Sequence, residues 1–84
     1  HTETTAFASQ VTQPCTATIA IYDLYLTRAH TIHASLNTGY NEISWDGRNS
    51  NHEILADGVY IYIITHHFSS HNETFTQKLV IQSK

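Results

Sequence analysis

An 84-residue chain is long enough for one small domain, and this chain has a net charge of −3 with only 13% charged residues, about half the usual share. The acidic balance argues against nucleic acid and against an anionic membrane surface as partners. No apolar run reaches the roughly 18 residues of a membrane span, so we expect no membrane insertion. Cys15 is the only cysteine, which excludes a disulfide within the chain and leaves one between chains open. Because the chain starts with His1 and not methionine, we expect a processed chain or a fragment of a longer precursor.

The first half of the chain alternates between apolar and polar residues in short runs, which is typical of half-buried strands. The first run centres on Phe7 and predicts an edge strand, and Pro14 predicts the turn after it because proline has no amide hydrogen to donate. The next run places Ile19 and Ile21 on one face of a strand. The predicted strands are residues 4–10, 16–24 and 28–33, with a turn over 11–15 and a loop over 34–38.

The centre of the chain holds the most aromatic and β-branched residues. Residues 39–45 predict a strand with Ile43 and Trp45 on one face, and residues 59–65 predict another that is apolar on both faces. A strand of the second kind is either central in its sheet and covered on both sides, or has one face against a partner. Between the two strands we expect a polar loop in which residues 53–56 form a short edge strand. Its structural turn residues are Asp46, Gly47, Arg48, Asp57 and Gly58.

The end of the chain predicts a polar hairpin loop over 66–73 and a last strand over 74–82, with Phe75 on its inner face. No helical spacing of apolar residues lasts longer than one turn. Six or seven short strands with regular turn signals predict an all-β fold, a small antiparallel β-sandwich that forms a single domain over residues 1–84. The predicted core residues are Ile19, Ile21, Ile43, Trp45, Tyr60, Tyr62, Leu79 and Ile81.

Two motifs in the centre of the chain carry a family resemblance. Trp45-Asp46-Gly47-Arg48 comes first, and Asp57-Gly58-Val59-Tyr60-Ile61-Tyr62 follows after a polar stretch. With Ile21-Tyr22-Asp23-Leu24 before them and Lys78-Leu79-Val80 after them, they make the chain similar to the Ig-like domain of the flagellar hook-capping (FlgD-type) family. The same domain occurs at the C-terminus of many secreted bacterial proteins, including sorting domains of the type IX secretion pathway. The resemblance implies an Ig-like β-sandwich.

The resemblance extends from Thr4 to Lys84 and implies that the first two strands form an N-terminal hairpin. It departs from the family pattern at Leu26 and Thr27, where the family places Gly-Arg to make a turn. Leucine and threonine enter the positive-φ region at a higher energy than glycine. Either the turn here has another geometry, or the second and third strands are joined more smoothly.

Seven histidines raise the question of a metal site. His66, His67 and His71 cluster in the predicted loop, and His30 and His33 lie on a predicted strand. Residues three apart on a strand point to opposite faces, and His66 and His67 diverge as well. No cysteine or carboxylate stands at a recognised ligand spacing. We therefore expect exposed polar histidines and no metal cofactor.

Catalytic chemistry finds little support in the sequence. No base is placed beside Cys15, and Asp46 and Asp57 each precede a glycine, which favours turns over paired carboxylates. With Asn49 and Asn51 these carboxylates could supply oxygen ligands for Ca²⁺, but the D-x-[DN]-x-[DN]-G spacing is absent. We expect no enzyme activity and no cofactor. A carbohydrate-binding aromatic platform is a further alternative to packing in the core for four rings, those of Tyr40, Trp45, Tyr60 and Tyr62.

These features predict a non-catalytic, secreted or cell-surface module that mediates protein–protein contact, with Val59, Ile61 and Ile63 as the candidate interface. The resemblance implies a C-terminal sorting or adaptor domain of a secreted bacterial protein, or one domain of an assembly factor. Its protein partner would be the secretion machinery or copies of itself. The alternatives are a self-assembling structural subunit of an extracellular filament or sheath and a carbohydrate- or metal-binding module.

Overall fold

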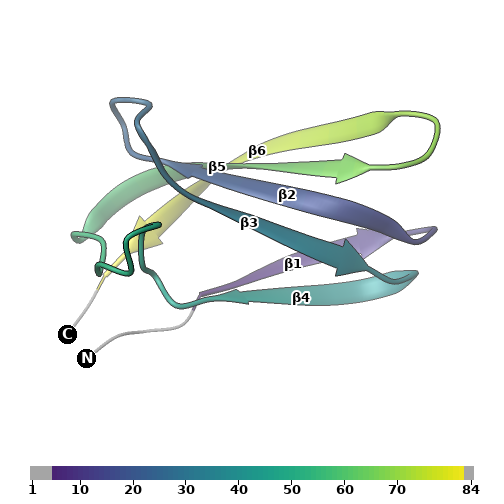
Figure 1. Cartoon of the computed structure of the whole chain (residues 1–84), viewed down its shortest axis with the longest axis horizontal. Coiled ribbons are helices and arrows are strands. Elements are labelled where there is room, and N and C mark those ends of the chain that lie inside the picture. The colour runs from purple at the N-terminus through teal and green to yellow at the C-terminus, as the bar shows by residue number, and fades with distance from the viewer. Residues whose placement is uncertain (1–4, 83–84) are drawn as a thin grey trace.

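The computed structural model describes residues 5–82, and these residues form six strands joined by turns and one longer loop (Figure 1). Thr4 and Lys84, which belong to the family resemblance, lie outside the described residues. In the described part of the chain no helix is long and apolar enough to cross a membrane. The strands are β1 (Thr5–Val11), β2 (Cys15–Tyr22), β3 (Arg28–Leu36), β4 (Gly39–Trp45), β5 (Gly58–His67) and β6 (Asn72–Ile81).

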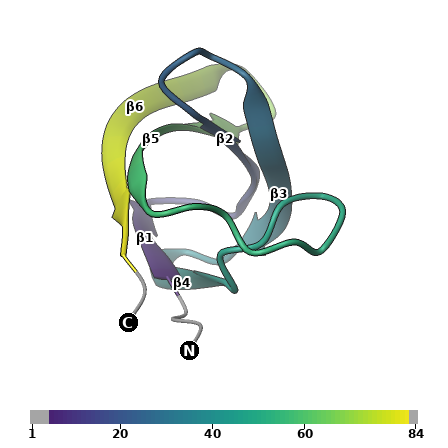
Figure 2. The same ribbon diagram turned by 90° about the vertical axis from the view of Figure 1, so that its left-hand side faces the viewer.

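The strands form two antiparallel sheets of unequal width, which confirms the predicted all-β sandwich. One sheet has the order β3-β2-β5-β6, and the other consists of β1 and β4. The smaller sheet lies against one face of the larger one (Figure 2). The expected N-terminal hairpin is wrong, because β1 pairs with β4 and not with β2. The turn at residues 12–14 instead carries the chain from one sheet to the other, so that Phe7 and Ile19 can face each other across the core.

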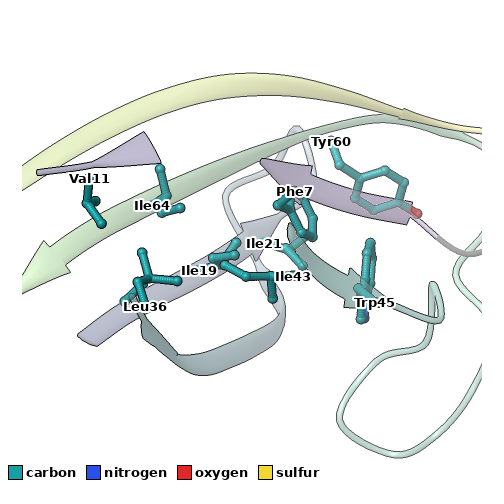
Figure 3. Packing of buried hydrophobic residues seen from close by; sticks show 10 residues of the cluster. Phe7, Val11, Ile19, Ile21, Leu36, Ile43, Trp45, Tyr60 and Ile64 are labelled. Carbon is teal, nitrogen blue, oxygen red and sulfur yellow. The ribbon is translucent and has the colours of Figure 1, made fainter. Parts of the chain in front are cut away.

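The core fills the space between the sheets and is centred on β2 (Figure 3). Ile19 and Ile21 are 0% exposed, because the strand has a hydrogen-bonded neighbour on each side and the smaller sheet covers its inner face. The ring of Phe7 on β1 packs edge-on against Tyr62 with 4.8 Å between centroids. Among the predicted core residues, Ile43, Trp45 and Tyr60 are also buried, whereas Tyr62, Leu79 and Ile81 are partly buried and pack against the core.

Several strands have other ends than the sequence predicted. The second strand ends at Tyr22, two residues early, because the Asp23 carboxylate starts a turn there. The third continues into the predicted loop at 34–38 and ends at Leu36, since Leu36 is buried and pairs with Cys15.

The last two strands also extend further than predicted. Residues 66–67 and 72–73 were expected in a loop and lie in β5 and β6, where His66 pairs with Glu73. A ladder is made by backbone groups, so polar side chains do not end it. The predicted edge strand at 53–56 is reduced to an isolated bridge between Arg48 and Ile54.

The burial of β2 leads to a test with two matched isoleucines. Ile19→Val removes one methylene from a fully buried side chain and should lower the free energy of unfolding by about 0.5–1.5 kcal/mol. Ile54→Val makes the same chemical change on an exposed side chain and should stay within about 0.5 kcal/mol of the parent. Urea unfolding followed by tryptophan fluorescence measures both. Equal effects of the two substitutions would contradict the placement of the core.

Candidate interaction surfaces

The loop after β4 is held by short hydrogen bonds to its own backbone. The indole Nε1–H of Trp45 donates to the carbonyl oxygen of Arg48 at 3.0 Å, and the Arg48 amide donates to Oδ1 of Asp46 at 3.1 Å. Gly47 between them has a φ of 78°, a conformation that glycine adopts without steric cost. The guanidinium of Arg48 then donates to the carbonyl oxygen of His52 at 2.9 Å. These bonds give the first predicted turn residues a structural role.

Asn49 organises the middle of the same loop. Its Oδ1 accepts hydrogen bonds from the amides of Asn51 and Glu53, at 2.9 and 3.0 Å, and its Nδ2 donates to the Glu53 carboxylate. At the end of the loop the hydroxyl of Tyr60 donates to the carbonyl oxygen of Ala56 at 2.8 Å. Burial, followed by the negative charges of Asp23 and Asp57, raises the pKa of the Tyr60 hydroxyl, which keeps it a donor. The loop oxygens proposed for calcium thus serve turn geometry at Asp46 and Asn49.

The histidines within residues 5–82 have different surroundings, although His66 and His71 both contact the ring of Phe68. His30 points inward and stacks on Trp45, with 6.1 Å between ring centroids, while His33 is exposed on the outer face. The expectation of exposed histidines is wrong for His66, which is 6% exposed and lies 3.3 Å from the Ser9 hydroxyl across the core. His67 points outward to Thr18 at 3.0 Å. Within residues 5–82 no group of three His, Cys, Asp or Glu side chains could hold a metal ion.

The aromatic rings considered as a sugar platform do not share an exposed face. Trp45 and Tyr60 are buried, whereas Tyr40 is exposed and its hydroxyl donates to Glu42 at 2.9 Å. Packing in the core, the alternative to a sugar platform for these rings, does not hold for Tyr40, which is not among the predicted core residues. Tyr40 lies near the start of β4, opposite Gln10, and the alternation of the strand turns its side chain away from the face that carries Ile43 and Trp45.

The candidate interface lies on the outer face of the four-stranded sheet. The inner face of β5 carries Tyr60 and Ile64, so the alternation of the strand turns Val59, Ile61 and Ile63 outward. Val59 is 38% exposed and the two isoleucines are partly covered by their neighbours. We call the patch around them the outer β5 face; by strand register it consists of Ala20, Tyr22, Val59, Ile61, Ile63, Thr76, Lys78 and Val80. Lys78 is the one charged residue among these eight.

The turn between β2 and β3, residues 23–27, is a second apolar surface, which the sequence analysis did not propose. We call it the hairpin tip. Leu24, Tyr25 and Leu26 are all exposed, and the tyrosine is 91% exposed. The Asp23 carboxylate accepts hydrogen bonds from the Tyr25 and Thr27 amides, both at 2.9 Å, which fixes the shape of the tip.

The hairpin tip also decides between the two geometries left open at Leu26. The chain makes a tight turn without glycine, and Leu26 takes a φ of 65°. A β-carbon in this region costs roughly 1–2 kcal/mol. In the sequence, the family's Gly-Arg is replaced by Leu26 and Thr27, and this departure marked the position of the unusual turn.

A third surface arises because the two sheets differ in width. β1 lies over β5, as the contacts of Phe7 with Tyr62 and of Ser9 with His66 demonstrate, and β4 lies over β3. No strand of the described chain lies opposite β6, so Phe75 is 47% exposed although it points inward. The result is a groove of about 270 Å³ between β1 and β6. We call it the β1/β6 groove; its lining includes Phe7, Ser9, Gln10, Ile64, His66, Phe75 and Gln77.

Cys15 stands at the start of β2 and is partly buried. Burial, and to a smaller extent the negative charge of Glu73, raises the pKa of its thiol. The thiolate is the nucleophilic form of cysteine, so the environment makes this thiol less reactive than a free one.

The conformation of Leu26 predicts the effect of glycine at the tip. Leu26→Gly should raise the free energy of unfolding by up to about 1 kcal/mol, since it removes the left-handed penalty and only part of that gain is lost to the greater freedom of glycine in the unfolded chain. Leu24→Gly is the control, because Leu24 is equally apolar and exposed but has no positive φ; it should destabilise by about 0.5–1 kcal/mol. Urea unfolding of dilute protein compares them, and a loss of stability in both variants would speak against strain at Leu26.

The raised pKa of Cys15 predicts slow alkylation. The rate of reaction with iodoacetamide should rise with pH through a midpoint that lies higher in the folded protein than in the chain unfolded in urea. Glu73→Gln should move the folded midpoint only part of the way back, because burial is the larger cause. A folded midpoint equal to the unfolded one would show that the thiol is in contact with water.

Comparison with known proteins supports the fold. Neither protein-family models nor curated proteins give a match to the chain. Among solved structures, FlgD from P. aeruginosa superimposes with a TM-score of 0.76 at 18% sequence identity, over 93% of this chain. The chain spans 62% of the length of that structure. Since the identity is low, the likeness shows the fold alone: the sandwich is FlgD-like.

Proposed function

We propose that this domain is a non-catalytic module of a secreted or cell-surface bacterial protein, and that it acts by binding another protein. Within this class we favour a C-terminal sorting or adaptor domain that the secretion machinery binds. The observation that carries the proposal is the outer β5 face. On this face the β-branched side chains of a central strand point outward, and the domain that carries it has a FlgD-like fold.

The chemistry of the outer β5 face suits a protein partner. Ile61 and Ile63 lie between Lys78 and Thr76 on one side and Tyr22 and Ala20 on the other, so the patch is apolar in its centre and polar at one edge. Such a centre and rim are typical of interfaces. Because the isoleucines are already partly covered by their neighbours, a partner removes only part of their surface from water. The expected contact is weak and transient, as fits a domain that export machinery binds and releases.

Several polar side chains that were considered for chemistry have structural contacts, which supports a structural role over a catalytic one. Asp46 and Asn49 accept hydrogen bonds from their own loop, and the Ser9 hydroxyl bonds to His66 inside the core. Each of these groups holds backbone or core geometry. The raised pKa of Cys15 works against its use as a nucleophile.

The sorting proposal is tested by attaching the chain to the C-terminus of a periplasmic fluorescent reporter in a bacterium that has type IX secretion. The reporter should reach the cell surface, and Ile61→Lys or Ile63→Lys should lower its surface level by roughly tenfold, because a lysine in the centre of the interface must lose water on binding. Ala6→Lys, at an exposed position on the other sheet, is the control for added charge.

Two results would count against the proposal. A reporter that stays in the periplasm with the unaltered chain would exclude the sorting role. Normal export of the Ile61→Lys and Ile63→Lys variants would keep the sorting role and exclude the outer β5 face as its surface. Thermal unfolding of each purified variant establishes that loss of export is not loss of folding.

A second candidate function is a structural subunit of an extracellular filament or sheath. The observation that favours it is independent of the outer β5 face: one molecule carries both an exposed apolar hairpin tip and an uncharged aromatic groove.

A further inference from the structure

We propose that the hairpin tip of one copy docks in the β1/β6 groove of the next copy, so that chains associate head to tail. The partner is thus a second copy of this chain. The inference deepens the structural-subunit candidate, on which it rests, and does not depend on the sorting role. It is carried by the apolar and strained tip, by the open groove beside Phe75, and by the positions of the two in the fold.

The hairpin tip has more structure than a connection requires. Three consecutive apolar side chains are exposed there, Leu24, Tyr25 and Leu26, and exposed runs of this kind are unfavourable in water unless they meet a partner. The Asp23 carboxylate and the backbone bond from the Leu26 amide to the Asp23 carbonyl, at 3.0 Å, hold the run in one conformation. Backbone strain at a non-glycine residue is typical of functional sites. A rigid tip also loses little conformational entropy when it binds.

The groove fits a narrow apolar element. Phe7 and Ile64 form its floor, and the exposed face of Phe75 forms the side made by β6. None of its lining residues is Asp, Glu, Lys or Arg, so an uncharged occupant avoids burying an unpaired charge.

The shape of the sandwich restricts what can enter the groove. β6 projects beyond β1 by one strand, since β1 lies over β5. Because β6 lines one side of the groove, we expect a narrow element such as a hairpin tip to enter it more readily than the edge of a second sandwich.

The exposed apolar side chains of the tip and the lining of the groove include no Asp, Glu, Lys or Arg, and the two surfaces cannot meet within one molecule. The groove lies beside the half of β5 that ends at His66, opposite Ala17 near the start of β2, whereas the tip follows Tyr22 at the other end of β2. Figure 1 shows the tip and the β5–β6 hairpin at opposite ends of the long axis. Exposed Arg28 stands beside the tip, but the Asp23 carboxylate within the tip offsets it, and Glu73 beside the groove lies 3.2 Å from His71. The match between the two surfaces therefore rests on the exposed apolar side chains.

A contact between two different surfaces of the same chain is heterologous. It leaves a free tip at one end of each assembly and a free groove at the other, so that it extends and does not close at two copies. The contact area is small, which makes the association weak and concentration-dependent. Sedimentation velocity between about 10 µM and about 1 mM therefore covers the expected range.

The test uses one variant on each side of the contact. Tyr25→Ser removes the exposed ring from the tip, and Phe75→Ser removes it from the groove. The parent chain should form oligomers that grow with concentration, and each variant alone should stay monomeric. An equimolar mixture should give a one-to-one dimer and stop there, because only the intact tip of the Phe75→Ser chain and the intact groove of the Tyr25→Ser chain can still meet.

Matched controls lie outside both surfaces. Tyr40→Ser removes another exposed tyrosine, and Val80→Ser changes the opposite face of β6; both should associate like the parent. Gln77→Lys is a second groove variant, at an exposed position, for the case that Phe75→Ser does not fold.

Three outcomes would overturn the inference. They are a parent chain that is monomeric over the whole range, single variants that associate like the parent, and a mixture that yields no dimer. None of them affects the sorting proposal, which is measured on a reporter fusion. A one-to-one dimer in the mixture alone supports docking of tip in groove, since no other self-association requires one intact copy of each.

Discussion

The unequal width of the two sheets is the constraint on which the rest of this structure depends. Four strands face two, and β1 and β4 cover β5, β2 and β3 but not β6. Burial is therefore complete on β2, where Ile19 and Ile21 are 0% exposed, and falls off toward β6. Leu79 and Ile81 pack against the edge of the core, while Phe75 stays half in water. The same imbalance makes a small core and creates the groove.

Polar contacts join the parts of the sandwich that apolar packing does not reach. The Ser9–His66 hydrogen bond connects the two sheets inside the core, at the level where β1 approaches β5. A buried pair of this kind costs little when both partners are satisfied and is destabilising when one is removed. The long loop after β4 is held by local hydrogen bonds, from the Trp45 indole and to Asn49. It is also joined to the sandwich, because the Leu55 side chain packs against the core and the Tyr60 hydroxyl donates to the carbonyl oxygen of Ala56.

The sequence predicted the fold class and most strand centres, because alternation and turn residues act locally. The prediction of Gly47 as a turn residue is an example, since aspartate before glycine specifies the turn within a few residues. The pairing of strands was not predicted correctly. Residues 4–24 are similar to a hairpin, but β1 pairs with β4, because pairing is decided by packing across the core. The strand ends at Leu36 and His67 were missed for the related reason that a ladder continues wherever its neighbour continues.

Only some of the candidate surfaces could be predicted from the sequence. The outward position of Ile61 and Ile63 follows from alternation on β5, and it could be predicted once the strand was placed. The groove could not be predicted, because it exists only where the smaller sheet has no strand opposite β6, and the width of a sheet cannot be derived from the pattern of residues within one strand. The tip lies between these cases. Leucine in place of glycine was visible in the sequence, but its exposure and its positive φ are properties of the folded turn.

The two kinds of surface are compatible in one molecule because they lie on different sides of β5. Ile61 and Ile63 point away from the core, whereas Ile64 and His66, which line the groove, point toward it. A protein bound on the outer β5 face therefore leaves the groove open, and a tip docked in the groove leaves the outer face free. Placing β5 between β2 and β6 gives each surface a hydrogen-bonded, rigid strand as its base. The proposed protein contact on the outer β5 face and the proposed docking of tip in groove therefore do not compete for the same side chains.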